Sequence, residues 1–244
     1  MFFMLPTTAI LAIYILAAIL PAVFLMRYIY RKDTVEPEPP MLLLSLVLAG
    51  VLAALASILL ETLGVNILDQ FVSQDSPAYT VILAFLVVAV VEEGTKFILL
   101  KLRTWRNPNF NYQFDGVIYA VFVSLGFAAF ENVKYVFGYG LSVAFPRAIL
   151  AIPGHMGFAV FMGVFYGRAK LCESRGNTAG KIANLFLGYL SAVLLHGFYD
   201  ACAMLGTTLA TVLFIAFVVI MYILVIRLVK REAQNDRPVD GGIF

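Results

Sequence analysis

Long apolar stretches, separated by short polar connections, run through the whole of this chain. A helix needs about 20 mostly apolar residues to cross the hydrocarbon core of a bilayer. Seven stretches meet this requirement, and the pattern therefore predicts an all-α, polytopic bundle that forms a single membrane domain over residues 1–244. The predicted spans are residues 3–26, 41–60, 78–100, 116–137, 148–167, 182–204 and 207–229.

The composition indicates a membrane protein rather than a soluble one. Of the 244 residues, 62% are hydrophobic and only 13% are charged, whereas a soluble domain has about 25% charged residues. A globule of this size cannot bury such an excess of apolar side chains, so most of the surface must face lipid. We therefore expect the bilayer to be a partner of this chain and nucleic acid not to be one.

The first apolar stretch is expected to be a transmembrane helix rather than a cleaved leader. Residues 1–26 contain no Lys or Arg, and the first basic residue, Arg27, follows the stretch. A secretory leader carries its positive charges before the apolar region. Residues 36–40, with the sequence EPEPP, are interpreted as a stiff polar linker to the second span.

The basic residues predict the orientation of the bundle. Of the 17 Lys and Arg residues, 14 lie in alternate connections or in the C-terminal tail. Positive charge favours the cytoplasmic side, so we expect a multi-pass protein of the plasma membrane with its N-terminus outside and its C-terminus in the cytoplasm. The 14 residues are Arg27, Arg31, Lys32, Lys101, Arg103, Arg106, Arg168, Lys170, Arg175, Lys181, Arg227, Lys230, Arg231 and Arg237.

The connection at residues 61–77 is more apolar than a simple loop. Leucine, isoleucine and phenylalanine recur there at helical spacing. This pattern is typical of a short helix at the outer interface, and it equally fits an extension of the second span.

Charged residues in the third span stand out, because each costs at least about 2.5 kcal/mol within a bilayer. Glu92 and Lys96 are four residues apart and can form an ion pair. Adjacent side chains on a helix point about 100° apart, so we do not expect Glu93 to share this partner. Mutual neutralisation thus explains why Glu92 and Lys96 can be present in the span. Glu93 has no such explanation and is a candidate general base.

Glu131 in the fourth span has two interpretations. It belongs to a set of functional intramembrane groups, or it is an acid near the interface that pairs with Lys134 or Arg147.

Both histidines of the chain lie inside predicted spans. His155 is in the fifth span, and His196 is in the sixth, four residues before Asp200 and therefore on the same helical face. This spacing suits two metal ligands, or a carboxylate that orients an imidazole; a hydrogen bond that only braces the bundle is the alternative. Gly163 and Gly167 instead form a small-xxx-small pair that is typical of helix packing.

Together these residues form a pattern that resembles the PrsW family of intramembrane proteases. The resemblance covers residues 85–204, which we expect to be the catalytic core. The same residues also resemble those of a related family, the type II CAAX prenyl endopeptidases. Those enzymes have His where this chain has Glu131 and often Asn where it has Asp200, so PrsW is the nearer pattern. The motifs are Glu92-Glu93-x-x-Lys96, Phe127-x-x-x-Glu131, His155 and His196-x-x-x-Asp200.

The resemblance implies an intramembrane endopeptidase. Its substrate would be a single-pass membrane protein, a regulator of the anti-sigma-factor type, cleaved near the outer face of the membrane. The resemblance also implies a metalloprotease, for which we expect Zn²⁺; activation of water by glutamate without a metal is the alternative.

Roles can be assigned to the individual residues on this basis. Glu92 or Glu93 would activate the water, and Lys96 and Asn132 would support the site. The remaining catalytic residues would bind the metal or position water and the oxyanion; they are Glu131, His155, His196 and Asp200.

Two other functions use similar residues. A proton- or ion-coupled transporter also places Glu, His and Asp inside the membrane, but such proteins usually contain internal repeats, and this sequence shows none. A non-catalytic scaffold related to the same superfamily is the second alternative. The intact Glu92-Glu93 pair favours chemistry over a scaffold.

Overall fold

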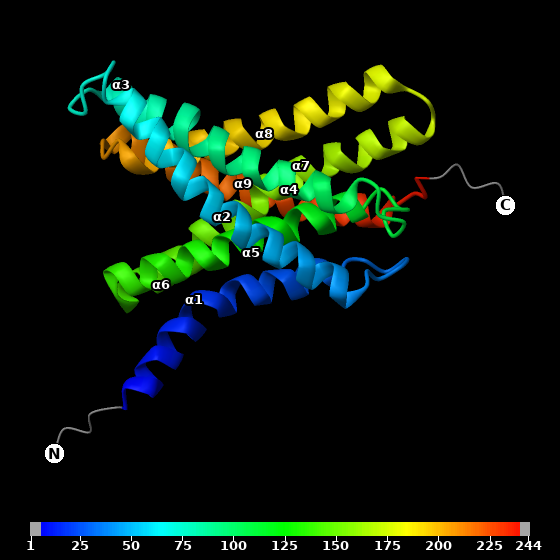
Figure 1. Ribbon diagram of the computed structural model, residues 1–244, viewed down its shortest axis with the longest axis horizontal. Coiled ribbons are helices and arrows are strands. Elements are labelled where there is room, and N and C mark those ends of the chain that lie inside the picture. The colour runs from blue at the N-terminus through cyan, green and yellow to red at the C-terminus, as the bar shows by residue number, and fades with distance from the viewer. Residues whose placement is uncertain (1–5, 240–244) are drawn as a thin grey trace.

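The computed structural model describes residues 6–239 and is a bundle of helices (Figure 1). Within these residues there is no β-strand, and the one isolated bridge joins Tyr112 to Pro238. The prediction of an all-α polytopic membrane protein is confirmed. The elements are α1 (Thr7–Tyr30), α2 (Pro40–Leu68), α3 (Pro77–Ile82), the π-helix η1 (Leu83–Ala89), α4 (Val90–Thr104), α5 (Asp115–Tyr139), the 3₁₀ turn η2 (Leu141–Val143), α6 (Ala144–Ile149), α7 (Ala151–Ser174), α8 (Thr178–Met204) and α9 (Thr208–Gln234).

Each predicted span falls on a helix, although not every helix meets the usual criteria for a span. Six helical segments in the described part of the chain are long and apolar enough to cross a membrane. The span predicted at 78–100 is instead a rod built from α3, η1 and α4, which the π-helix divides and which carries the acid pair. Residues 3–5 of the first predicted span lie outside the described residues.

Local sequence explains where several helices begin and end. α2 starts at Pro40, whose missing N–H is no loss in a first helical turn. α2 then continues to Leu68, so the apolar spacing after residue 60 belongs to an extension of the second span and not to a separate interfacial helix. At the start of α3, the Ser76 side chain accepts a hydrogen bond from the Ala78 N–H at 3.2 Å.

α5 forms the centre of the bundle and is buried along most of its length. Close helix contacts surround it. A Cβ on Gly126 would lie 2.8 Å from the Cα of Val47 in α2, and a Cβ on Gly163 of α7 would lie 2.6 Å from the Cα of Val117 in α5. Gly167 is in a similar close contact with the main chain of Gln113, at the α5 end of the same interface. The packing role predicted for Gly163 and Gly167 is confirmed.

The π-helix lies directly before the acid pair and packs against α8. Gly197 of α8 lets the ring of Phe85 approach its backbone, because any Cβ there would overlap the ring. The Tyr189 hydroxyl on α8 also donates a hydrogen bond to the Val90 carbonyl at 3.0 Å. These contacts hold the start of α4 beside α8, which carries His196. π-Helical segments often occur at functional sites.

Candidate active site

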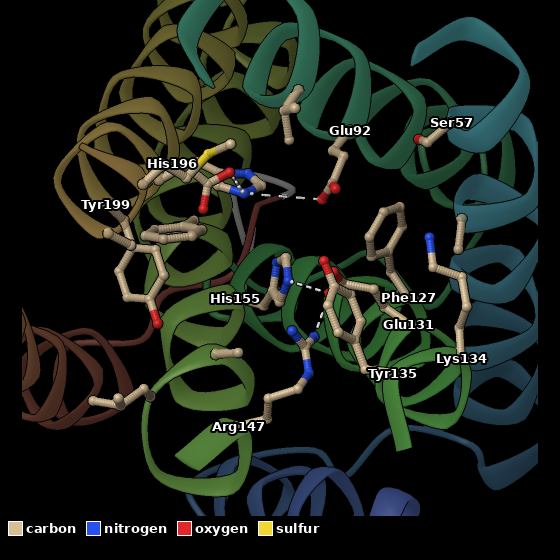
Figure 2. Close-up of a pocket in the computed structure, with 18 of the residues that line it drawn as sticks. Ser57, Glu92, Phe127, Glu131, Lys134, Tyr135, Arg147, His155, His196 and Tyr199 are labelled. Carbon is tan, nitrogen blue, oxygen red and sulfur yellow. Dashed lines mark hydrogen bonds and ion pairs between the residues drawn. The ribbon is translucent and has the colours of Figure 1, made fainter. Parts of the chain in front are cut away.

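Four helices bring the predicted site residues together (Figure 2). α4 carries the acid pair and Lys96, α5 carries Glu131, α7 carries His155, and α8 carries His196 with Asp200. The residues of the acid pair, Lys96 and both histidines are no more than 6% exposed. Such groups tolerate burial only when they satisfy one another.

Lys96 lies at the centre of the cluster. Its Nζ is 3.1 Å from Oε2 of Glu92, 2.8 Å from Oε1 of Glu93 and 3.2 Å from Nδ1 of His155. It also sits 3.9 Å from the centre of the Phe127 ring. The ion pair predicted between Glu92 and Lys96 is confirmed.

The expectation that Glu93 would not share this partner is wrong. Glu92 and Glu93 lie four and three residues before Lys96, and both spacings place side chains on adjoining parts of one helix face. The long lysine side chain bridges the angle between the two acids. Glu93 is therefore a paired carboxylate and not a free one.

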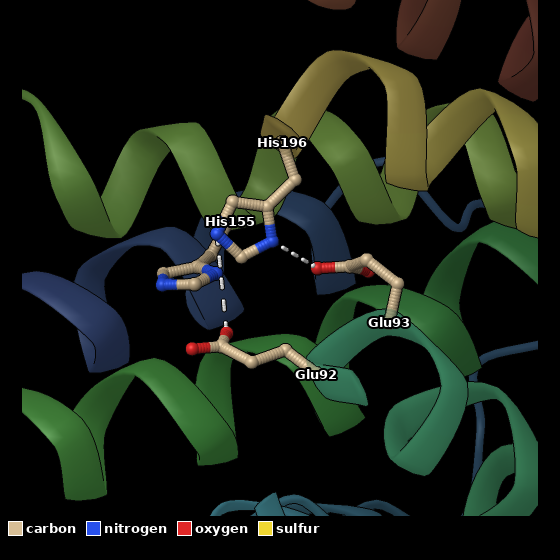
Figure 3. A group of neighbouring side chains, drawn as sticks. All are labelled: Glu92, Glu93, His155 and His196. Atoms are coloured by element: carbon tan, nitrogen blue, oxygen red, sulfur yellow. Dashed lines mark hydrogen bonds and ion pairs between the residues drawn. The ribbon is translucent and has the colours of Figure 1, made fainter. Parts of the chain in front are cut away.

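His196 contacts carboxylates on two helices, and Figure 3 shows the two that come from α4, Glu92 and Glu93. Its Nδ1 is 2.9 Å from Oε1 of Glu93, and its Nε2 is 3.3 Å from Oδ2 of Asp200 and 4.0 Å from Oε2 of Glu92. The ring of Phe158 stacks on the imidazole with centroids 4.9 Å apart. The contact predicted between His196 and Asp200 is confirmed, and both nitrogens of the imidazole lie beside carboxylates.

The contacts of His155 define which of its nitrogens carries a proton. A lysine ammonium can only donate, so Nδ1 of His155 accepts from Lys96 and the proton lies on Nε2. That nitrogen is 3.0 Å from Oε2 of Glu131 and donates to it. The backbone carbonyl of His155 accepts a further hydrogen bond from the Ser124 hydroxyl at 2.9 Å, which ties α7 to α5.

Glu131 belongs to the buried cluster and also pairs with Arg147, so both of its expected contacts occur together. Besides His155, its Oε2 contacts Nη2 of Arg147 at 2.9 Å. Arg147 is itself held by Asn132, whose Oδ1 accepts from Nε at 2.9 Å and whose Nδ2 donates to the Ala18 carbonyl at 2.8 Å. Asn132 thus supports the site by fixing the arginine that pairs with Glu131.

One cavity of about 590 Å³ gives access to this cluster. Five of the six predicted catalytic residues line it, and Glu93 lies behind them without reaching its wall. Sequence reasoning missed Glu61 and Tyr199, which also line the cavity. Glu61 could have been found, because the extension of α2 places it on the same helix as two other lining residues, Ala54 and Ser57. The lining residues of the predicted set are Glu92, Glu131, His155, His196 and Asp200.

The donor atoms of the cluster fit a transition-metal ion. Glu92, Glu93, His155 and His196 each offer one oxygen or nitrogen, and these atoms all lie within 4.8 Å of one another. In addition, Oε2 of Glu93 is buried without any hydrogen-bond partner. Two imidazoles with two carboxylates are a ligand set that suits Zn²⁺.

This group differs from the predicted ligands, which were His155 and His196 with Glu131 and Asp200. The structure places Glu131 at Nε2 of His155, the nitrogen opposite the one that contacts Lys96, and it places Asp200 at Nε2 of His196, outside the group of four. In known metal sites such carboxylates orient the histidine ligands.

The helical bundle defines a polytopic membrane protein that buries a cluster of acids and imidazoles in its interior. Residues 38–241 match the model of the PrsW family, described as intramembrane metalloproteases. The chain belongs to the PrsW family of intramembrane proteases.

Similarity to individual members extends over three quarters of the chain or more. The chain is 32% identical to protease PrsW of Clostridioides difficile over 93% of its own length and 94% of the relative. It is 32% identical to protease PrsW of Oceanobacillus iheyensis over 90% of its length and 95% of the relative. Protease PrsW of Bacillus subtilis is 29% identical over 75% of this chain and 79% of that relative. No solved structure matches this chain.

Proposed function

We propose that this protease hydrolyses a peptide bond of a single-pass membrane protein inside the cavity, with Glu92 as the base that activates water. The observation that carries this assignment is the position of the two acids: Glu92 lines the cavity and Glu93 does not. A general base must reach the water that it deprotonates. Glu93 instead holds His196 and Lys96 in place through contacts of 2.9 and 2.8 Å.

The imidazoles and their carboxylates prepare the reaction space. Glu131 keeps the proton of His155 on Nε2, so that Nδ1 faces the acid pair. Asp200 fixes the ring of His196 from the cavity side. Two rigid imidazoles beside Glu92 position water and the substrate carbonyl without reorganisation during the reaction.

A metal ion fits the same residues. Of the four residues Glu92, Glu93, His155 and His196, the last three would hold Zn²⁺, which when bound would supply Lewis-acid activation of water and of the substrate carbonyl and would leave Glu92 free as the base. Lys96 lies close to three of these donors. Its ammonium limits the negative charge of the two carboxylates and keeps them at a fixed separation.

The substrate we propose is a membrane-anchored regulator of the anti-sigma-factor type in the plasma membrane. Two features support it. The family is one of intramembrane proteases, and the cavity lies toward the end of the bundle opposite the basic connections, which is the predicted outer end. An extended segment of a substrate that enters from this side would reach Glu92 past Arg147 and Tyr199.

Quantitative proteomics of membrane fractions tests this function. Cells that contain the wild-type protein should accumulate truncated forms of one or a few single-pass proteins, and cells with Glu92→Gln should not. Glu232→Gln is the matched control, because Glu232 lies on α9 and pairs with Arg168, away from the cavity. Identical fragment patterns in wild type and Glu92→Gln would refute the proposal.

A further inference from the structure

A second group of acidic side chains lies at the end of the bundle that carries the basic connections. We call Asp33, Glu38, Asp115 and Asp236 the acidic cluster. Asp33 and Glu38 belong to the α1–α2 connection, Asp115 is the first residue of α5, and Asp236 follows α9. Figure 1 shows the C-terminal segment, in red, beside the connection between α4 and α5. The cluster therefore joins three parts of the chain that are distant in sequence.

Three acids of the cluster are buried and Asp236 is half-buried, and within the described residues none of the four has a positive partner. Asp33 is 7% exposed, Glu38 is 3% exposed and Asp115 is 1% exposed. Among residues 6–239, none of the four acids forms a salt bridge, although most of the basic residues of the chain lie at this end. Burying an ionised carboxylate without a partner is strongly unfavourable, so these acids need either a proton or a positive charge from elsewhere.

Hydrogen bonds satisfy only part of the cluster. Oε1 of Glu38 accepts from the Tyr119 hydroxyl at 2.7 Å, and Oδ2 of Asp115 accepts from the Tyr112 N–H at 2.7 Å. Oδ1 of Asp236 accepts from the Phe114 N–H at 2.8 Å.

Two oxygens remain without a partner. They are Oδ2 of Asp33 and Oε2 of Glu38, and both are fully buried. Native proteins rarely leave buried polar atoms unpaired, and such atoms indicate a bound water or ion.

We propose that the acidic cluster binds a hydrated divalent cation, Mg²⁺, on the predicted cytoplasmic side. Carboxylate and carbonyl oxygens are the ligands of hard cations, and the cluster contains no sulfur or imidazole. No three of these acids offer oxygens within 4.8 Å of one another; in the described part of the chain only the intramembrane group does so. Mg²⁺ keeps several waters and takes one or two carboxylates directly, so it suits this wider spacing better than Ca²⁺.

The ionisation of the acids agrees with a cation. Burial raises the pKa of Asp33 to about 6 and the pKa of Glu38 to about 7, and repulsion from neighbouring acids contributes to both shifts. Both groups therefore carry negative charge above neutral pH, where a cation is needed to offset their repulsion. The cation would then stabilise the contacts that hold the C-terminal segment, such as the hydrogen bond from the Gln113 N–H to the Arg237 carbonyl at 2.9 Å.

Thermal unfolding of the full-length protein in detergent tests the site. After EDTA treatment and its removal at pH 7.5, MgCl₂ should raise the Tm of the wild type by at least about 3 °C relative to NaCl of equal ionic strength. Asp33→Asn and Glu38→Gln should each lose this response. Without Mg²⁺, neither variant should unfold at a lower temperature than the wild type, because each removes an unpaired buried charge.

Two control variants separate this site from other effects. Asp75→Asn changes an exposed acid at the opposite end of the bundle and should keep the full response. His196→Ala removes a donor of the intramembrane group and should also keep it, so the result does not depend on the proposed protease mechanism. No rise in the Tm of the wild type, an equal rise in Asp33→Asn and Glu38→Gln, or loss of the response in His196→Ala would each overturn the proposal.

Discussion

The Nζ of Lys96 lies 2.8 Å from Oε1 of Glu93, within a part of the protein that is expected to be inside the bilayer. This contact changes the role of the second acid of the pair. A carboxylate that neutralises a buried lysine contributes to the shape of the site, because loss of one partner leaves the other charge unpaired. Glu92 is then the acid that is available to the substrate, since it alone of the two lines the cavity.

Substitution of each acid by glutamine separates these roles. We expect Glu92→Gln to lower the cleavage rate by about 10²- to 10⁴-fold, the usual contribution of a general base, with a small change in Tm. Glu93→Gln should lower the Tm more strongly, because it weakens the closest contacts of both Lys96 and His196. Cleavage of the physiological substrate and thermal unfolding are the two measurements. An inactive Glu93→Gln protein with the Tm of the wild type would assign the base to Glu93 instead.

Metal analysis distinguishes the two possible ligand sets. Mass spectrometry of the purified protein should find Zn²⁺ in the wild type and none in His196→Ala. Glu131→Gln and Asp200→Asn should still bind the metal, with about 10- to 100-fold weaker affinity, because carboxylates that only orient a histidine have effects of this size. If Asp200→Asn lost the metal as completely as His196→Ala, Asp200 would be a direct ligand, as the sequence predicted.

The close contact between α2 and α5 predicts a strong effect of a single methyl group. Gly126→Ala would place its Cβ 2.8 Å from the Cα of Val47, and such overpacking costs about 1–3 kcal/mol or more. We expect a clear fall in Tm. Gly138→Ala is the control on the same helix, because a Cβ at that position meets no atom within 4 Å. Equal Tm values for the two variants would show that α2 and α5 can separate without cost.

The acidic cluster predicts how stability depends on pH when Mg²⁺ is absent. The pKa of Asp33 is raised to about 6 and that of Glu38 to about 7 by burial. Between about pH 4, near the values of the unfolded chain, and about pH 7, the folded protein therefore binds more protons than the unfolded chain. The contribution of these groups is fully present below pH 4 and is lost as the pH rises through the folded values.

The difference in Tm between wild type and Asp33→Asn isolates this contribution from that of other groups. We expect the wild type to lose stability relative to Asp33→Asn as the pH rises from 4 to 8 in EDTA, and Mg²⁺ to restore it. Thermal unfolding at a series of pH values measures both effects. If the difference in Tm between wild type and Asp33→Asn stayed constant from pH 4 to 8, the pKa of Asp33 would be the same in the folded and unfolded protein, contrary to this prediction.

The spans and the chemical residues of the site could be predicted because they depend on local pattern. Apolar length places α5, and the spacing of His196 and Asp200 places two groups on one helix face. Contacts between helices were not accessible in this way. The angle between Glu92 and Glu93 describes where two Cβ atoms point, and it says nothing of a lysine long enough to reach both carboxylates.

The acidic cluster was missed for a related reason. The local sequence of residues 36–40 predicts a polar linker, yet Glu38 is 3% exposed. Its neighbours Asp115 and Tyr119 belong to α5 and approach it only in the folded chain. Nothing in the local sequence of a Glu-Pro repeat indicates that it will be covered.

The π-helix η1 affects how this protein tolerates changes in chain length. A π-turn contains about one residue more than an α-turn, so its seven residues cover about the same rotation as six residues of α-helix. Deletion of one apolar residue from Leu83–Ala89 would therefore let the segment become α-helical while Glu92 and Glu93 keep their direction. Insertion of one residue in the same segment cannot be absorbed by a change from π-helix to α-helix. It would turn both acids by about 100° away from the two histidines.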